Sequence, residues 1–140
     1  MVRAGEAVAA RQAGGLFVGA TSDRKDDLMD QTQGVSLEGW NMVRADDAEW
    51  VPWTGSAGEA RAKILGTADG YMVTLVEAKP GYAGSPHEHA NAEFNYVVGG
   101  SLRNQGQQMS AGDGYAAAAG STHTDFETET GATYIVIFKI

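Results

Sequence analysis

The amino-acid sequence predicts an all-β fold, a β-sandwich or barrel formed by a single domain. With 140 residues, the chain has room for one hydrophobic core. Its 19 glycines against 3 prolines indicate many tight turns between short strands. Beyond residue 60, short β-rich segments alternate with glycine turns, and no convincing helical pattern separates them. Together these observations favour a sandwich or barrel of short strands.

Residues 1–40 are polar and irregular in pattern, and we expect them to form an N-terminal arm or a short helix. Thr21 or Ser22 is suited to cap a helix over residues 23–32, and Gly34 follows its expected end. A flexible arm accounts for the same residues equally well, so both interpretations stay open.

Residues 41–140 are expected to form the barrel, which begins with an edge segment. Residues 42–53 contain Trp50, Pro52 and Trp53. Proline lacks the N–H that a central strand needs, and tryptophan rings bury large apolar surfaces. We therefore expect an edge strand, or a strap that packs its aromatic rings on the barrel.

The remaining strands are runs of β-branched and aromatic residues between turn residues. Within residues 71–78, alternate side chains face opposite sides, so Met72, Thr74 and Val76 share one face. The same pattern continues to the end of the chain. The expected strands cover residues 60–65, 71–78, 93–98, 101–108, 114–118, 123–128 and 132–139, with turns at 66–70, 80–81 and 99–100.

The charge of the chain argues against several classes of partner. The formal net charge is −8, and after residue 80 the basic residues are Arg103 and Lys139 alone. Binding to nucleic acid or to an acidic membrane surface needs clustered basic residues, so we expect neither. No apolar run approaches the length of a membrane span, and the N-terminus does not have a continuous apolar signal core. A cytoplasmic location is the resulting expectation.

The chemistry of the chain is concentrated in its three histidines. The sequence has no cysteine, so any metal site must use nitrogen and oxygen ligands. His87 and His89 are two apart, so on a strand their side chains face one side. Glu93 begins the next expected strand, and His123 must arrive from another one. Three neutral imidazoles and one carboxylate suit Fe(II), Mn(II), Ni(II) or Zn(II), and they leave positions for water or substrate.

The spacing of these residues continues into two longer patterns. One pattern resembles the first motif of the cupin superfamily: Gly81, five residues, His87, one residue, His89, three residues, Glu93, six residues and Gly100. A later pattern is similar to the second motif of that superfamily: Gly112, five residues, Ala118, one residue, Gly120, two residues and His123. The resemblance covers about residues 60–140. It implies a jelly-roll barrel whose metal lies between two sheets.

By position, the resemblance gives the ligand role to His87, His89, Glu93 and His123. It implies one divalent metal ion per chain, with Fe2+ preferred and Zn2+, Mn2+ or Ni2+ as alternatives. The sequence departs from the family at Ala118, where proline is usual, and at Glu127, where asparagine is usual. Neither position is a ligand in the family, so the departures leave the site intact. We expect the turn before His123 to be less rigid as a result.

The resemblance also implies a function. The Trp50–Trp53 segment looks like that of small cupins that cleave carbon–carbon bonds in dicarbonyl or aryl-ketone compounds. We therefore expect a mononuclear metal-dependent enzyme, an Fe(II) dioxygenase of a small carbonyl or aromatic-ketone substrate. The catalytic base is then a metal-bound hydroxide, or Glu93 if it leaves the metal. The alternatives are a non-redox lyase or isomerase that uses Zn, Mn or Ni, and a non-catalytic sensing module similar to the cupin part of zinc-dependent anti-sigma factors.

Strand alternation suggests neighbours for the ligands. If Glu93 and His123 face inward, Asn95 and Asp125 should do so too, and Asp125 is then placed to accept a hydrogen bond from an imidazole. A position of Asp125 at the rim, in water, is the alternative. Ala116 and Ala118 add little bulk to their face, so the cavity is expected to be roomy. Core or interface packing is the expected role of five larger side chains, Tyr71, Met72, Phe94, Tyr96 and Tyr115.

The expected partners are a small-molecule substrate and a second copy of the chain. The cupin resemblance implies a homodimer, and the sheet has an apolar face for a partner to cover. Leu37 and Trp40 lie in the N-terminal segment, which is a candidate to cross over and pack on the neighbour.

Overall fold

The fold is all-β, as the sequence predicts. A computed structural model describes residues 37–140. The possible helix over residues 23–32 lies outside the described residues. Within residues 37–140 the helical structure is a single 3-10 turn, η1 (Ala45–Asp47). The strands are β1 (Val51–Trp53), β2 (Ala60–Ala68), β3 (Tyr71–Ala78), β4 (His87–Glu88), β5 (Glu93–Asn104), β6 (Gln107–Ser110), β7 (Gly114–Ala117), β8 (Thr122–His123), β9 (Phe126–Glu127) and β10 (Ala132–Lys139).

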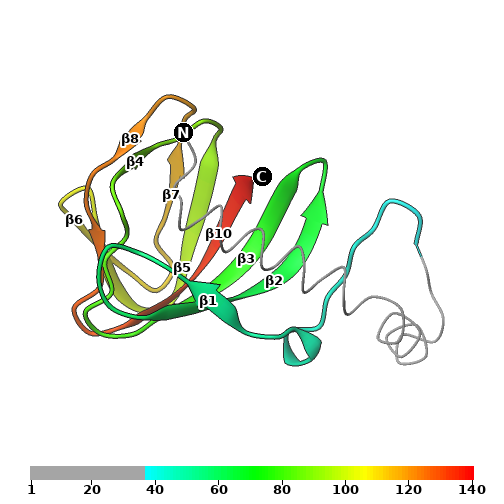
Figure 1. Cartoon of the computed structure of the whole chain (residues 1–140), viewed down its shortest axis with the longest axis horizontal. Helices are drawn as coiled ribbons and strands as arrows, with labels where there is room; N and C mark the ends of the chain where they lie inside the picture. Colours follow the sequence, from blue (N-terminus) through cyan, green and yellow to red (C-terminus); the bar gives the residue numbers. More distant parts are fainter. Residues whose placement is uncertain (1–36) are drawn as a thin grey trace.

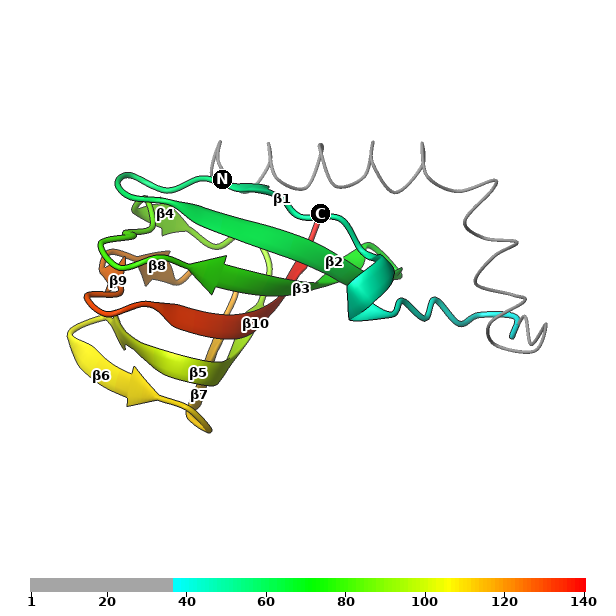
Figure 2. The ribbon, with the colours of Figure 1, turned by 90° about the horizontal axis from the view of Figure 1, so that it is seen from below.

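The strands form a large curled sheet and a small two-stranded one. The large sheet has the order β1-β2-β3-β10-β5-β6, and β7 and β9 both pair with β5. The small sheet consists of β4 and β8. Figures 1 and 2 show β2, β3, β10 and β5 side by side along the curve, with β4 and β8 running together apart from them. The small sheet carries two of the three histidines, His87 in β4 and His123 in β8.

The core follows from the alternation of side chains along the central strands. In β3 and β10 every second residue is buried, and the buried residues of the two strands are register partners. The predicted inward face of Met72, Thr74 and Val76 is thus confirmed. Burial of these apolar side chains is the main force that curls the sheet on itself. The buried apolar residues are Val51, Trp53, Ala62, Ile64, Met72, Val76, Ala78, Tyr82, Val97, Leu102, Met109, Phe126, Ala132, Tyr134, Val136 and Phe138.

Two hairpins turn on a pair of residues with positive φ. Asp69 and Gly70 join β2 to β3 with φ values of 52° and 81°. Gln105 and Gly106 join β5 to β6 with φ values of 50° and 77°. Two-residue turns of this hand match the twist of antiparallel strands, and they require glycine or a tolerant polar residue. The turn predicted at residues 66–70 is therefore shorter than expected, because β2 continues to Ala68.

The turn predicted at Gly99 and Gly100 does not end the strand. β5 runs through both glycines to Asn104, and its pairing with β10 shifts register there: Thr133 pairs with Gly99 and Tyr134 with Val97. The extra residue is a β-bulge, which bends the strand and reverses the faces on which its side chains lie. Before the bulge the odd-numbered residues are buried, whereas after it Leu102 is buried.

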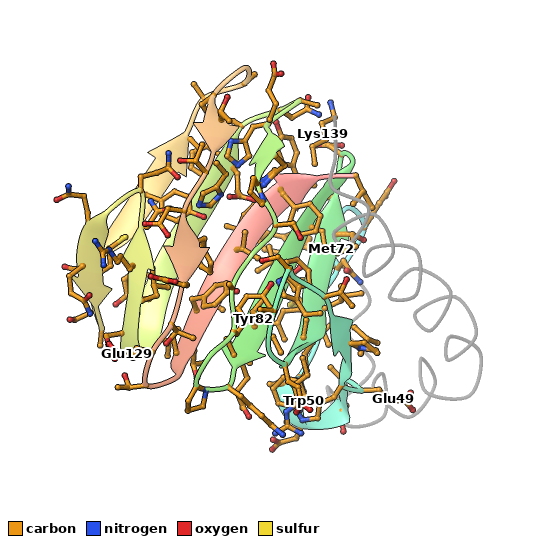
Figure 3. The ribbon with its side chains drawn as sticks, turned by 60° about the vertical axis from the view of Figure 1, so that its left-hand side comes forward. Glu49, Trp50, Met72, Tyr82, Glu129 and Lys139 are labelled. Carbon is orange, nitrogen blue, oxygen red and sulfur yellow. The ribbon has the colours of Figure 1, made fainter. Side chains whose placement is uncertain are left out.

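The strand β1 lies at one edge of the large sheet, where the sequence predicts an edge strand. β1 pairs with β2 alone, and Trp53 is buried with its ring 5.9 Å from that of Phe138. The Trp50 ring instead lies beneath the Arg61 guanidinium, 4.0 Å from its centroid. Figure 3 shows Trp50 beside Glu49 at this border of the molecule. A cation over an indole ring contributes about 0.5–1 kcal/mol at an exposed site, so this stacking covers the edge.

Two further observations concern the surface. Within residues 37–140, no helix has the length and apolar character needed to span a membrane.

On the outer face of β5, Phe94, Tyr96 and Val98 are 45%, 53% and 48% exposed. The expected core assignment is right for Met72, which is 2% exposed. Phe94 and Tyr96 are not in the core, and the interface packing expected as the alternative stays a prediction.

The two neighbouring glycines of β5 give a stability prediction. A Cβ on Gly100 would lie 2.2 Å from the carbonyl oxygen of Gly131, and its φ is 70°. A Cβ on Gly99 would meet nothing within 4 Å. Gly100→Ala should therefore lower the free energy of unfolding by about 2–4 kcal/mol, and Gly99→Ala by at most about 0.5 kcal/mol. Urea denaturation of both variants measures this, and equal losses would contradict the assigned close approach.

The homodimer stays a prediction, and the exposed side chains of β5 indicate where to test it. Tyr96→Glu places a charge on the apolar outer face and should convert a dimer into monomers. Gln108→Glu adds the same charge at an exposed position of β6 and should leave the assembly unchanged. Sedimentation at micromolar concentration distinguishes the species. A wild-type protein that sediments as a monomer would refute the prediction.

Candidate metal centre

Strand pairing brings the three histidines together. His87 in β4 and His123 in β8 are direct register partners. His89 follows β4 and stays paired with the same neighbouring segment: its N–H donates to the Ser121 carbonyl (2.8 Å), and its carbonyl accepts from the Gly120 N–H (2.7 Å). The predicted convergence of residues 34 positions apart in the sequence is thereby explained by one short antiparallel pair.

The three rings surround one point. A ring nitrogen of each histidine lies within 4.8 Å of those of the other two. The ring centroids are 4.6 Å apart for His87 and His89, 5.2 Å for His87 and His123, and 5.4 Å for His89 and His123. His89 and His123 are 7% and 5% exposed, while His87 is half-buried. This spacing is suited to a single ion held by three nitrogens.

Backbone oxygens select the tautomers of the first two rings. His87 Nδ1 lies 3.0 Å from the Ser85 carbonyl oxygen. His89 Nδ1 lies 3.2 Å from the Ser121 carbonyl oxygen and 3.0 Å from Ser121 Oγ. A carbonyl only accepts, so each Nδ1 carries the hydrogen and donates it. In the neutral ring, Nε2 then presents a lone pair, which is the form that binds a metal.

The third ring is oriented by a residue that sequence reasoning missed. His123 Nε2 lies 2.6 Å from Asn104 Oδ1, an amide oxygen that accepts its hydrogen. The lone pair of the neutral ring is then on Nδ1, which lies 3.8 Å from Glu93 Oε2. A hydrogen-bond partner of this kind fixes the ring and raises the basicity of a ligand. Asn104 therefore has the role that the sequence suggested for Asp125.

Asp125 lies at the rim, which was the alternative to its inward placement. Its side chain is 39% exposed, and its Oδ2 accepts a hydrogen bond from the Gly106 N–H at 3.1 Å. The same oxygen lies 3.9 Å from Arg103 Nε. Asp125 thus stabilises the turn between β5 and β6. The alternation that would have placed it inward is broken because β8 and β9 are separate two-residue strands.

Glu93 is buried beside two of the imidazoles. It is 4% exposed, and its Oε2 lies 3.3 Å from His89 Nε2 and accepts a hydrogen bond from Tyr115 Oη at 2.9 Å. Burial raises the pKa of this carboxyl, but when the imidazoles are protonated, the hydrogen bonds from His89 and Tyr115 and the charges of His89 and His123 outweigh it, so the pKa lies below its usual value. The group is therefore a carboxylate at neutral pH.

These contacts fit a cation. His89 donates outward through Nδ1, so its Nε2 lone pair faces the carboxylate oxygen of Glu93, and two acceptors face each other at 3.3 Å. A proton or a metal ion is needed to make this arrangement favourable. The nitrogen donors suit a divalent transition metal. The ligand role of Glu93 stays a prediction, since its carboxylate is held by Tyr115 as well.

A small cavity adjoins the histidines. It has a volume of about 20 Å³, which is room for about one water molecule. The prediction that Asn95 faces inward is confirmed. Tyr115 packs against the core, as expected, and its hydroxyl in addition donates to Glu93. Ala116 and Ala118 are exposed and do not enlarge the cavity. Its wall consists of Trp53, Tyr82, Glu93, Asn95, Tyr115, His123, Phe126, Tyr134 and Val136.

The motif positions outside the ligands have structural roles. The four motif glycines, Gly81, Gly100, Gly112 and Gly120, all have positive φ, as expected of turn residues. The Ala118 carbonyl accepts hydrogen bonds from the Ser121 N–H (3.1 Å) and Oγ (2.6 Å). These two bonds close the turn before His123 where the family has proline.

Comparison with known proteins agrees with this geometry. The family model described as ChrR Cupin-like domain matches residues 39–139. No curated protein matches the chain. A solved structure from Methylibium petroleiphilum, described provisionally as an acetylacetone dioxygenase, is 17% identical, with a TM-score of 0.66 over 75% of this chain and 80% of that one.

Two other solved structures have the same fold. Acetylacetone dioxygenase from Acinetobacter johnsonii is 13% identical, with a TM-score of 0.62, and the match covers 75% of this chain and 76% of that one. The polyketide cyclase RemF from Streptomyces resistomycificus is 23% identical, with a TM-score of 0.61 over 71% and 79% of the two chains. At these identities the likeness concerns the fold.

The contacts of the rings predict how metal affinity responds to mutation. His123→Ala should abolish tight binding of Ni(II), because it removes one of three converging nitrogens. Asn104→Ala should weaken binding by about 10–100-fold, since it releases the orientation of His123. Asn91→Ala, at an exposed position, serves as the control and should change nothing.

Isothermal titration calorimetry of the purified variants measures these affinities. Full Ni(II) occupancy in His123→Ala would contradict the three-histidine site. An unchanged Ni(II) affinity in Asn104→Ala would contradict the orienting role of the Asn104 amide and would leave the three-histidine site standing.

Proposed function

The chain belongs to the family of ChrR cupin-like domains, and from this membership we propose that it is a mononuclear Fe(II) dioxygenase of a small carbonyl compound. The observation that supports the proposal most is the set of three imidazoles with fixed tautomers, closed around one point beside a buried carboxylate. Acetylacetone dioxygenases with this fold add support from the chemistry that their names state.

The reaction class balances without a further reductant. Both atoms of O2 enter the products, a carbon–carbon bond of the substrate breaks, and the substrate supplies the four electrons that O2 accepts. A ferrous ion held by the three imidazoles would bind the carbonyl oxygens, raise the acidity of the neighbouring C–H group, and leave a position for O2.

Glu93 is the residue placed to move the proton. Its Oε2 is ionised at neutral pH and buried beside the ring nitrogens, so it can accept the proton that the substrate loses on enolisation. Tyr115 holds this oxygen in place with its hydroxyl at 2.9 Å. No lysine or further histidine is available in the sequence around the motifs to act as a separate base.

The wall of the cavity restricts the access of water. Trp53, Phe126 and Tyr134 bring aromatic rings to its surface, and Tyr82, labelled in the interior in Figure 3, is 1% exposed. Exclusion of water strengthens electrostatic interactions at the reacting atoms and protects reactive species.

A second candidate is a non-catalytic sensing module that binds Zn(II). The family match spans residues 39–139, which is nearly the whole described chain, and the sequence resembles the cupin part of zinc-dependent anti-sigma factors. A non-redox enzyme that uses Zn, Mn or Ni as a Lewis acid would need the same imidazoles. Metal identity and O2 consumption separate these candidates from the dioxygenase.

Glu93→Gln tests the proposal. The purified wild-type protein should contain about one iron per chain by elemental analysis, and the iron-loaded form should consume O2 with a small carbonyl compound that chelates the metal through two oxygens. Glu93→Gln should keep most of the iron but lose most of the turnover, by about 100-fold, since a general base typically contributes 10²–10⁴-fold. Glu88→Gln, on the exposed neighbour of the same motif, is the matched control.

The opposing results are distinct. Loss of iron in Glu93→Gln, equal to that in a histidine variant, would assign the carboxylate as a ligand. Tight zinc binding without O2 uptake by the iron-loaded protein would favour the sensing module and overturn the dioxygenase.

A further inference from the structure

Asn95 has a buried polar atom that the described part of the chain leaves without a partner. The residue is 6% exposed, lies on the inner face of β5 two positions after Glu93, and forms part of the cavity wall. Its Oδ1 is buried and has no hydrogen-bond partner within residues 37–140. A buried amide oxygen without a hydrogen bond is unfavourable, so its position on the wall of a cavity marks a place for a donor group.

The contacts of Tyr115 determine which end of the amide faces that ligand. Tyr115 Oη donates its one hydrogen to Glu93 Oε2 at 2.9 Å. The Asn95 amide group therefore meets the hydroxyl as a donor, through Nδ2 at 3.5 Å. If the amide were reversed, two acceptors would face each other there, because the hydroxyl hydrogen is already used. The chain of donors from Asn95 through Tyr115 to Glu93 thus leaves Oδ1 as the acceptor for the ligand.

We propose that Asn95 is a specificity-determining residue, and that a ligand whose oxygens bind the metal places an O–H or N–H group in this cavity, where the group donates to Asn95 Oδ1. This inference rests on the proposed metal centre and narrows its substrate class. An enolised dicarbonyl compound with carbon substituents alone has no such hydrogen once both oxygens are bound. A small carbonyl compound with a hydroxyl, amide or amine group next to its chelating oxygens has one.

The rest of the wall agrees with this ligand class. Phe126 and Val136 add apolar surface to the wall beside the polar groups of Glu93, Asn95 and His123. Sites built to receive a polar hydrogen reject analogues that lack it, because the buried acceptor is then left unsatisfied. Asn95 is consequently placed to exclude plain diketones, whereas a leucine of similar size would accept them.

The experiment uses two chelators that bind metal through the same pair of oxygens. Acetohydroxamate keeps an N–H beside its chelate ring, and N-methylacetohydroxamate lacks it. Calorimetric affinities of both are measured on the full-length Ni(II)-loaded protein, on Asn95→Leu, and on the exposed control Asn91→Leu. The preference for acetohydroxamate, expressed as the ratio of the two chelator affinities, should be about tenfold larger in the wild type and in the control than in Asn95→Leu. The comparison of ratios removes the steric effect of the methyl group.

The outcomes separate this inference from the proposed function. Equal ratios in the wild type and Asn95→Leu, with Ni(II) bound in both, overturn the inference and leave the metal centre standing. Failure of the wild type to bind Ni(II) overturns both. Thermal denaturation without chelator adds an independent reading: Asn95→Leu should be as stable as the wild type, since it removes an unsatisfied oxygen. A stability loss of many degrees would show a structural amide and overturn the assignment.

Discussion

The outward hydrogen bonds of the three imidazoles are the constraint on which the site depends. Each ring donates one N–H to an oxygen of the scaffold, namely the carbonyls of Ser85 and Ser121 and the amide of Asn104. A ring held in this way cannot rotate or change tautomer without losing that bond in a buried, low-dielectric environment, where the loss is expensive. The converging nitrogens are therefore fixed before any ion arrives, and the ion does not have to supply the energy of ordering them.

The long strand β5 connects the metal centre to the cavity and to the core. Its first half places Glu93 and Asn95 on the inner face, opposite β7, where Tyr115 is the register partner of Asn95. The resulting series of contacts makes acid–base behaviour and ligand recognition parts of one network. The β-bulge after Val97 then reverses the inner and outer faces of the strand. This reversal allows one strand to contribute both the carboxylate at its beginning and the Asn104 amide at its end.

Metal binding and specificity are consequently set by different parts of the fold. The β4–β8 pair holds His87 and His123, and His89 follows directly after β4. The cavity wall combines His123 of this pair with side chains from β1, β5, β7, β9 and β10. The chemistry of this chain is therefore decided by few residues around a common centre.

The sequence by itself determined the all-β class and most strand positions, because side-chain alternation is a local property of the chain. The meeting of His87, His89 and His123 was predicted from the resemblance of their spacing to the cupin motifs, since His123 lies 34 positions after His89. It could not determine the orienting residues. Asn104 lies 11 positions after Glu93, an odd spacing that places the two on opposite faces of a regular strand, and only the bulge, formed by pairing with the distant β10, brings both inward. Tyr115 was likewise recognisable only from its register with β5. Which side chains reach the ligands was decided by tertiary structure, since strand register and bulges depend on contacts between distant segments.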